Sequence, residues 1–281
     1  MWPDDAAGRA AITRVLGCTP RRLVRLAGGC VAEVFRVELD AEWLVAKVDD
    51  PRTGQLHIEG AMLHDLAPHL PVPAVRHAEP GLLLLEWVEG ASRFGEATEE
   101  HAAALLASLH RVTAPRFGYG YDTLIGGLAQ PNPQSESWLP FFAEHRLLEM
   151  AAQARAAGHL GAADHRRVER LAGRLDRWLT EPAQPALLHG DVWSGNVLAS
   201  GDRIRAFLDP AIYFGHPEVE LAFIAMFATF GPRFFDAYGI EAGFHEQRCP
   251  LYNLYPYLVH LRLFGGSYLG AVRSTLERFG V

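Results

Sequence analysis

Three polar residues in the second half of the chain have the types and spacing that phosphoryl transfer requires. Asp191 stands in a His-Gly-Asp run, Asn196 follows five residues later, and Asp209 comes after the apolar stretch 204–208. A phosphoryl-transfer site needs a group that orients the attacking hydroxyl and oxygen ligands for magnesium. Kinases meet both needs with a catalytic-loop Asp, an Asn five residues on and a further Asp. We therefore expect Asp191 to accept the proton of the substrate hydroxyl, and Asn196 and Asp209 to hold Mg²⁺ on the phosphates.

Each of these segments also has an ordinary structural explanation. Asp, Gly and Asn are common in the turns at strand ends, whatever a protein does. His189 is itself expected to be a structural residue, hydrogen-bonded to the loop backbone, rather than a base. The ordered occurrence of the three polar residues after apolar runs such as 186–188 favours the catalytic interpretation.

A kinase also needs a cradle for the nucleotide, and the first part of the chain has candidates in the right order. Lys47 ends the second strand of an expected hairpin, where its ammonium group can reach the α- and β-phosphates. Glu59 follows twelve residues later on an expected helix, where it can pair with Lys47. The backbone amides of Gly28 and Gly29 could approach phosphate, although the full G-x-G-x-x-G spacing is absent. A solvated lysine, a surface carboxylate and a plain Gly turn are the alternatives, and the joint placement favours the cradle.

The strand expected over 81–88 should lead into a hinge between two lobes. Backbone N–H and C=O groups at Glu86, Trp87 and Val88 could pair with the adenine ring of ATP. The alternative is a buried strand that binds no ligand.

The surrounding pattern predicts an α+β protein with the bilobal layout of kinases. Alternating runs within 33–48 should form a β-hairpin, and apolar residues within 55–67 recur at helical spacing. Most of the later sequence reads as helix, apart from the motif region and a Gly/Pro/Asn-rich loop at 115–135. We therefore expect residues 1–88 to form a small β-rich, nucleotide-binding lobe that includes the hinge strand. Residues 89–281 should form the larger helical lobe with the catalytic and substrate sites.

Composition limits the classes of function. The 281 residues carry a net charge of −7, which argues against a nucleic-acid partner, and 49% are hydrophobic, which is ample for a core. We expect a cytoplasmic protein with no membrane partner, because apolar runs of membrane-spanning length and signal-peptide features are missing. The cysteines Cys18, Cys30 and Cys249 are odd in number and far apart, which predicts reduced thiols rather than a disulfide framework or a zinc site.

Cys30 allows two interpretations that bear on the oligomeric state. A thiol beside phosphate-facing amides would favour thiolate formation, oxidation and an inter-chain disulfide, so that a redox-dependent dimer could exist beside a monomer. A small, buried, apolar residue is the other interpretation.

Longer stretches around these residues resemble one known family. The chain is similar to the fructosamine/ketosamine-3-kinases, within the aminoglycoside phosphotransferase-like, protein-kinase-like fold. Trp193 is the most specific match, because the broader phosphotransferase group does not generally require Trp at that position. The resemblance covers nearly the whole chain and rests on LLHGDVWSGNVL at 187–198, LDPAIYFGHPEVELA at 208–222, RFGYGYDTLIGGLAQPN at 116–132, SWLPFFAEHRL at 137–147 and LYNLYPYLVHLRLFGGSYL at 251–269.

The resemblance implies an activity and an acceptor. It implies ATP-dependent phosphorylation of the sugar 3-hydroxyl of a ketosamine, free or protein-bound, such as a ribulosamine, erythrulosamine or fructosamine. The unstable 3-phosphate is then lost and the amine is freed, which is deglycation. Trp193 and His216 are implied as substrate residues, and the indole of Trp193 suits both the apolar side of a sugar and an ammonium group. ATP and Mg²⁺ are the implied cofactors.

Departures from the family pattern keep other functions open. Pro217 stands where Arg is usual, Glu220 where Asp is usual, and 227–230 replaces a more Gly-rich stretch. These departures bear on substrate preference more than on phosphoryl transfer. One alternative is a kinase for another hydroxylated amine, such as an aminoglycoside or choline. A nucleotide-binding, redox-sensing protein with weak activity is the other.

Overall fold

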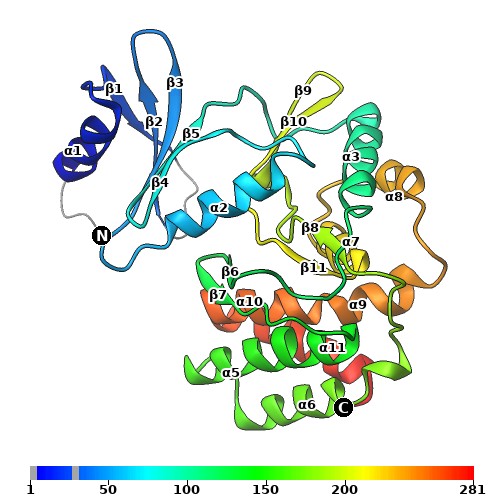
Figure 1. Ribbon diagram of the computed structural model, residues 1–281. Helices are drawn as coiled ribbons and strands as arrows, with labels where there is room; N and C mark the ends of the chain where they lie inside the picture. The colour runs from blue at the N-terminus through cyan, green and yellow to red at the C-terminus, as the bar shows by residue number, and fades with distance from the viewer. Residues whose placement is uncertain (1–4, 27–31) are drawn as a thin grey trace.

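The computed structural model describes residues 5–26 and 32–281 and consists of two lobes (Figure 1). The smaller lobe contains a five-stranded antiparallel sheet with the strand order β1-β2-β3-β5-β4. Its elements are α1 (Asp5–Leu16), β1 (Arg22–Arg25), β2 (Glu33–Glu38), β3 (Trp43–Val48), α2 (Leu56–Leu66), β4 (Val75–Glu79) and β5 (Leu82–Glu86).

The two faces of this sheet bury different helices, because successive side chains of a strand point to opposite faces. Leu82 and Leu84 of β5 belong to a core cluster with Ile12 of α1. Leu83 and Leu85 belong to another cluster with Leu56 and Leu63 of α2. The four leucines Leu82–Leu85 of β5 are therefore all buried, because helices cover both faces of the strand, and only the terminal Glu86 is exposed.

The predicted hairpin is confirmed, since β2 and β3 pair antiparallel with Val34 opposite Lys47. Strands β1 and β4 were not expected from the sequence. Both lie at sheet edges and carry charged residues, such as Arg22, Arg25 and Arg76. Charged residues are common on edge strands because they discourage pairing with other chains, and they hide the apolar alternation that marks a strand.

The larger lobe is mostly helical and is built around one extended hydrophobic core. Its helices are α3 (Glu96–Leu109), α4 (Trp138–Phe142), α5 (Glu149–Ala156), α6 (Ala162–Ala172), α7 (Pro217–Met226), α8 (Pro232–Tyr238), α9 (Cys249–Tyr252), α10 (Leu254–Phe264) and α11 (Leu269–Arg278). Its strands are β6 (Thr123–Ile125), β7 (Leu128–Gln130), β8 (Ala186–Leu188), β9 (Val197–Ser200), β10 (Arg203–Phe207) and β11 (Tyr213–Gly215). The lobe boundary predicted at residues 88 and 89 stays a prediction.

The segment 115–135, expected as a loop, contains the short hairpin β6-β7. Its two-residue turn, Gly126-Gly127, has φ values of +54° and +79°. Positive φ at both turn positions matches the twist of a tight hairpin, and Gly adopts it without strain. The hairpin stays on the larger lobe because Thr123 Oγ1 donates to the carbonyl of Ile212 at 3.0 Å. Within the described residues, the helices lack the combination of length and apolar character that a membrane span requires.

Candidate active site

The short pair β8-β11 brings the two main motifs of the sequence together. The strands are antiparallel with Leu188 opposite Tyr213. The chain leaves β8 toward Asp191 and enters β11 from Asp209, so both Asp residues lie at the same end of the pair. The N–H of Ala211 donates to the carbonyl of His189 at 2.7 Å and extends this register to the edge of the site.

Gly190 is required by the backbone of this loop. It adopts a φ of +87°, in the region that favours glycine. A Cβ atom at this position would lie 2.2 Å from the carbonyl oxygen of Ala211. The neighbouring His189 is buried, and its Nδ1 accepts from the N–H of Asp191 at 3.3 Å. The structural role predicted for His189 is confirmed by this contact.

Asp191 and Asn196 form one hydrogen-bonded unit. The Nδ2 group of Asn196 donates to Asp191 Oδ2 at 2.9 Å and to the backbone carbonyl of Asp191 at 3.0 Å. The single amide therefore orients both the side chain and the backbone of the predicted base. Burial and the nearby charge of Asp209 raise the pKa of Asp191 to about 8, so the carboxyl group gains affinity for a proton.

Lys47 joins the two lobes at this site. Its Nζ group donates to Glu59 Oε1 at 2.7 Å and to Asp209 Oδ1 at 2.6 Å. Burial alone would lower the pKa of Lys47, but the charges of Asp209 and Glu59 outweigh it and raise the pKa. The lysine is therefore a fixed cation between the two carboxylates, and the predicted pairing of Lys47 with Glu59 is confirmed.

Glu59 reaches Lys47 because α2 lies close to the sheet. The next residue, Gly60, faces β4, where a Cβ atom would lie 2.5 Å from the Cβ atom of Ala78. A larger residue would push the helix away from the strand, and the Glu59 carboxylate would move with it. Asp209 has an unusual backbone of its own, with a φ of +52° in a non-Gly residue. Such strain persists only where surrounding contacts hold it.

The other predicted nucleotide contacts are placed in part. Strand β5 ends at Glu86, so Trp87 and Val88 lie beyond the sheet pairing in the connection to the larger lobe. Trp87 Nε1 donates to Glu89 Oε1 at 2.7 Å, and its ring centroid lies 6.0 Å from that of Trp43. The hinge role of these residues stays a prediction. Gly28, Gly29 and Cys30 lie outside the described residues.

Trp193, predicted to contact substrate, keeps 39% of its surface exposed two residues after Asp191. Its ring covers Gly195, where a Cβ atom would lie 2.3 Å from the indole. The ring centroid also lies 5.9 Å from that of Phe227. The indole thus packs against Gly195 and Phe227, and part of its surface stays accessible.

His216, the second predicted substrate residue, caps a helix. Its Nδ1 accepts from the N–H of Glu218 at the start of α7, at 3.1 Å. Its ring packs beside Trp138 and Tyr252, at centroid distances of 6.2 and 5.6 Å. Burial, and to a lesser extent the positive charge of Arg248, lower the pKa of His216 to about 4. These contacts account for the histidine without a substrate, and its substrate role stays a prediction.

The structure adds two buried residues that the sequence did not mark as part of the site. Glu220 of α7 accepts from the N–H of Gly190 at 2.6 Å and contacts His110 Nε2 at 2.8 Å. His110 Nδ1 in turn contacts the hydroxyl of Tyr238 at 2.7 Å. Glu220 therefore anchors the turn before Asp191 from behind. Its only sequence signal was the presence of Glu where Asp is usual in the resembling family.

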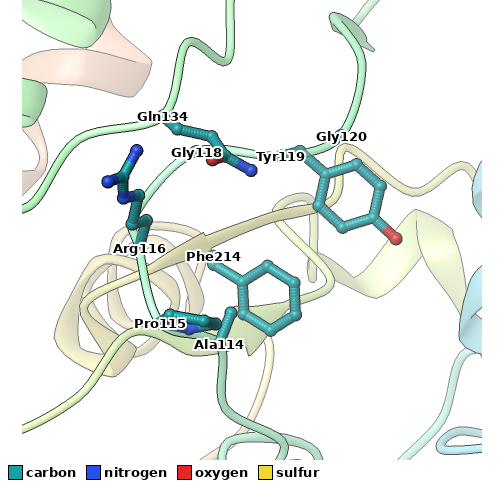
Figure 2. A pocket seen from close by; sticks show the side chains of 8 residues that line it. All are labelled: Ala114, Pro115, Arg116, Gly118, Tyr119, Gly120, Gln134 and Phe214. Carbon is teal, nitrogen blue, oxygen red and sulfur yellow. The ribbon is translucent and has the colours of Figure 1, made fainter.

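A groove lies on the segment 119–134, outside the residues assigned to the site. It has a volume of about 560 Å³ and is bordered by Tyr119, Tyr121 and His145. A neighbouring cavity of about 200 Å³ shares Tyr119 and Gln134 with it and includes Phe214. Figure 2 shows the rings of Tyr119 and Phe214 beside each other in this second cavity, with the side chains of Arg116 and Gln134 across from them.

Comparisons with known proteins agree with this geometry. Residues 9–279 match the family model described as fructosamine kinase. The chain is 33% identical to the "Probable ketoamine kinase" of Enterococcus faecium, over 92% of this chain and 95% of that protein. It is 30% identical to the chloroplastic protein-ribulosamine 3-kinase of Oryza sativa subsp. indica, over 99% and 88%. The crystal structure of a fructosamine-3-kinase homologue from Thermobifida fusca covers 96% of both chains at 32% identity with a TM-score of 0.85. The predicted bilobal α+β fold is therefore confirmed.

Proposed function

Because this chain belongs to the fructosamine kinase family, we propose that it is an ATP-dependent ketosamine-3-kinase. The acceptor is the 3-hydroxyl of a sugar that is joined to an amine as a ketosamine. The oxygen of this hydroxyl attacks the γ-phosphorus of ATP, its proton passes to Asp191, and the bond between the γ-phosphorus and ADP breaks. Elimination of the 3-phosphate from the product, followed by hydrolysis with water, then separates the amine from a dicarbonyl sugar fragment.

This proposal rests mainly on two hydrogen-bonded groups of residues, one around Asp191 and one around Lys47, that lie at one site. Asn196 orients Asp191 in the larger lobe, and Lys47 connects Glu59 of the smaller lobe to Asp209. Phosphoryl transfer depends mainly on positioning and on stabilising the charge of the phosphates. A base, a fixed cation and two oxygen-bearing metal-ligand candidates in this arrangement support both requirements.

The residues present also fit a magnesium ion. Asn196 donates through Nδ2, which leaves its amide oxygen for a ligand role, and Asp209 uses only Oδ1 in its contact with Lys47. Magnesium in such sites is held by oxygen ligands and by substrate phosphates. Asn196 and Asp209 would hold the ion, which would neutralise charge on the phosphates. The local charge supports this assignment, because the carboxylates of Glu59 and Asp209 share the single ammonium of Lys47.

The exposed indole of Trp193 supports an acceptor that is both a sugar and an amine. An aromatic face can cover the apolar side of a sugar chain and attract an ammonium group, which is worth roughly 0.5–2 kcal/mol. The ring packs against Gly195 and Phe227. It follows Asp191 by two residues in the sequence. A substrate whose hydroxyl meets Asp191 would bring its remaining part near this ring.

A substrate panel tests the proposal. ATP consumption with Mg²⁺ is measured for ribose-, erythrose- and fructose-derived ketosamines of lysine, free and protein-bound, with an aminoglycoside and choline as comparison acceptors. We expect turnover of ketosamines with a product phosphorylated at the 3-hydroxyl, and small ketosamines should be used at least as well as fructose-derived ones. The Asp191→Asn variant serves as the matched inactive control. Turnover of the aminoglycoside or choline, with none of any ketosamine, would overturn the assignment.

A further inference from the structure

The far end of helix α2 is held by the larger lobe. Asp65 lies in the last turn of α2 and accepts two hydrogen bonds, from the hydroxyl of Tyr119 at 2.9 Å and from the hydroxyl of Tyr121 at 2.8 Å. The two tyrosines lie 54 and 56 residues further along the chain, in the segment that leads to β6. Hydrogen bonds to a charged acceptor are stronger than neutral ones, so this pair is a substantial contact between the lobes.

The tyrosines are themselves fixed to the strand that follows Asp209. Gly118, directly before Tyr119, exchanges two backbone hydrogen bonds with Phe214 of β11, at 2.8 and 3.0 Å. The ring of Tyr119 stacks on that of Phe214 at a centroid distance of 5.7 Å, and the ring of Tyr121 packs edge-on against Tyr119 at 5.1 Å. In Figure 2 the hydroxyl of Tyr119 points away from Phe214, which leaves it free to meet Asp65.

Helix α2 therefore has two connections to the larger lobe. One runs from Glu59 through Lys47 to Asp209, and the other runs from Asp65 to the two tyrosines. The six residues from Glu59 to Asp65 correspond to about 9 Å along the helix axis. A rigid helix fixed at both points can neither pivot about the lysine nor slide along the sheet. The position of the Glu59 carboxylate then depends on the contact at Asp65.

We propose that Asp65, Tyr119 and Tyr121 form a latch that positions α2 so that Glu59 holds Lys47 ready for ATP. The three are positioning residues, because they act through Glu59. This inference rests on the proposed function only in requiring that Lys47 binds ATP. Burial and the charge of Asp65 raise the pKa of both tyrosine hydroxyls, which keeps them protonated donors under working conditions.

The first test is the variant Asp65→Ala. We expect kcat/KM for ATP to fall about tenfold, in line with the loss of two hydrogen bonds to a charged group. Amide hydrogen exchange over residues 56–66 should become faster, because the helix loses one of its two connections. Asp65→Asn keeps an acceptor oxygen and should restore most of both properties. The matched control is His64→Ala, which changes the exposed residue next to Asp65 on the same helix.

Two further comparisons separate positioning from general stability. The double variant Tyr119→Phe/Tyr121→Phe should reproduce the effect of Asp65→Ala, and combining all three changes should add little. The control is Tyr268→Phe, at a tyrosine that packs beside His260 in the larger lobe, and this variant should change nothing. If the latch acts through Glu59, then Asp65→Ala should cause no further loss of ATP binding in a Glu59→Gln background. The proposal would be overturned if Asp65→Ala weakened ATP binding further in the Glu59→Gln background. It would also be overturned if amide hydrogen exchange of α2 were unchanged in Asp65→Ala.

Calorimetric binding of MgADP and hydrogen exchange both work without an acceptor. These two measurements therefore judge the latch even if the acceptor is not a ketosamine. Failure of the substrate panel with a positive latch result would reject only the acceptor. The opposite pattern would reject only the latch.

Discussion

The ammonium group of Lys47 contacts Asp209 Oδ1 at 2.6 Å, across 162 residues of sequence and between two lobes. The same ammonium contacts Glu59 Oε1 at 2.7 Å. One buried cation thus connects the helix of the smaller lobe to the residue assigned to magnesium in the larger lobe. The proposed function puts the phosphates of ATP beside this cation, and phosphate binding would then require the two lobes to keep this relative position.

Asp191→Asn should preserve the fold and nucleotide binding and lower kcat by about 10²–10⁴-fold. That is the usual contribution of a positioned general base, and the amide of Asn keeps an oxygen for the bond from Asn196. Steady-state kinetics and MgADP binding check both parts. Turnover equal to that of the parent would remove Asp191 from the base role.

Asp209→Ala should weaken magnesium-dependent nucleotide binding as well as the rate, because a proposed metal ligand and a partner of Lys47 are lost together. Calorimetry of ADP binding with and without Mg²⁺ should show that most of the magnesium dependence has disappeared. Asp191→Asn is the comparison, since it should keep that dependence. Equal magnesium dependence in the parent and in Asp209→Ala would contradict the ligand assignment.

Trp193→Ala should lower kcat/KM for ketosamines about tenfold or more, while the affinity for ATP changes little. A tenfold change corresponds to about 1.4 kcal/mol, within the range of a cation–aromatic contact. Phe227→Leu keeps an apolar side chain next to the indole and should have a smaller effect. An equal loss of ATP binding in Trp193→Ala would mean that the indole only supports the loop.

Glu220→Ala should destabilise the protein by about 2–5 kcal/mol, because the N–H of Gly190 and the ring of His110 would lose a buried, charged partner. Glu220→Gln keeps an oxygen for Gly190 and should cost less. Urea unfolding measures the difference. Glu100→Ala, which removes an exposed ion pair with Arg233, is the surface control and should change stability by at most about 1 kcal/mol. A loss in Glu220→Ala no larger than this would argue against the anchoring role.

His216→Asn should make stability less dependent on pH. The pKa of His216 is lowered to about 4 by burial, so between roughly pH 4 and 6.5 the unfolded chain binds a proton that the folded chain does not. The parent should therefore lose about 1–3 kcal/mol as the pH falls through this window, and gain nothing from this group above pH 7. Asn also caps helices well but does not titrate, so its urea midpoint should fall less from pH 7 to pH 4.5.

The same variant tests the predicted substrate role of His216. An unchanged KM for ketosamines at pH 7, together with the flatter pH profile, would leave His216 as a helix cap only. A raised KM would support its contact with the acceptor.

The central hairpin, the α+β class and the catalytic loop could be read from the sequence because each depends on residues close together in the chain. Alternating residues specify β2 and β3, and the short spacing from Asp191 to Asn196 lets one amide reach its neighbouring carboxylate. The pairing of Lys47 with Glu59 joins residues only twelve apart, on a strand and on the helix that follows it. Local periodicity and short loops suffice for such contacts.

The remaining features depend on tertiary contacts that leave no local pattern. His110 and Glu220 are 110 residues apart, and each taken alone is an ordinary polar residue on a helix. Asp65 meets Tyr119 only because the two lobes pack together. The sequence by itself determined which chemical groups the protein has and the order in which they follow one another. Only the folded structure decided which buried polar groups meet, because a hydrogen bond between distant residues depends on the packing of every element between them.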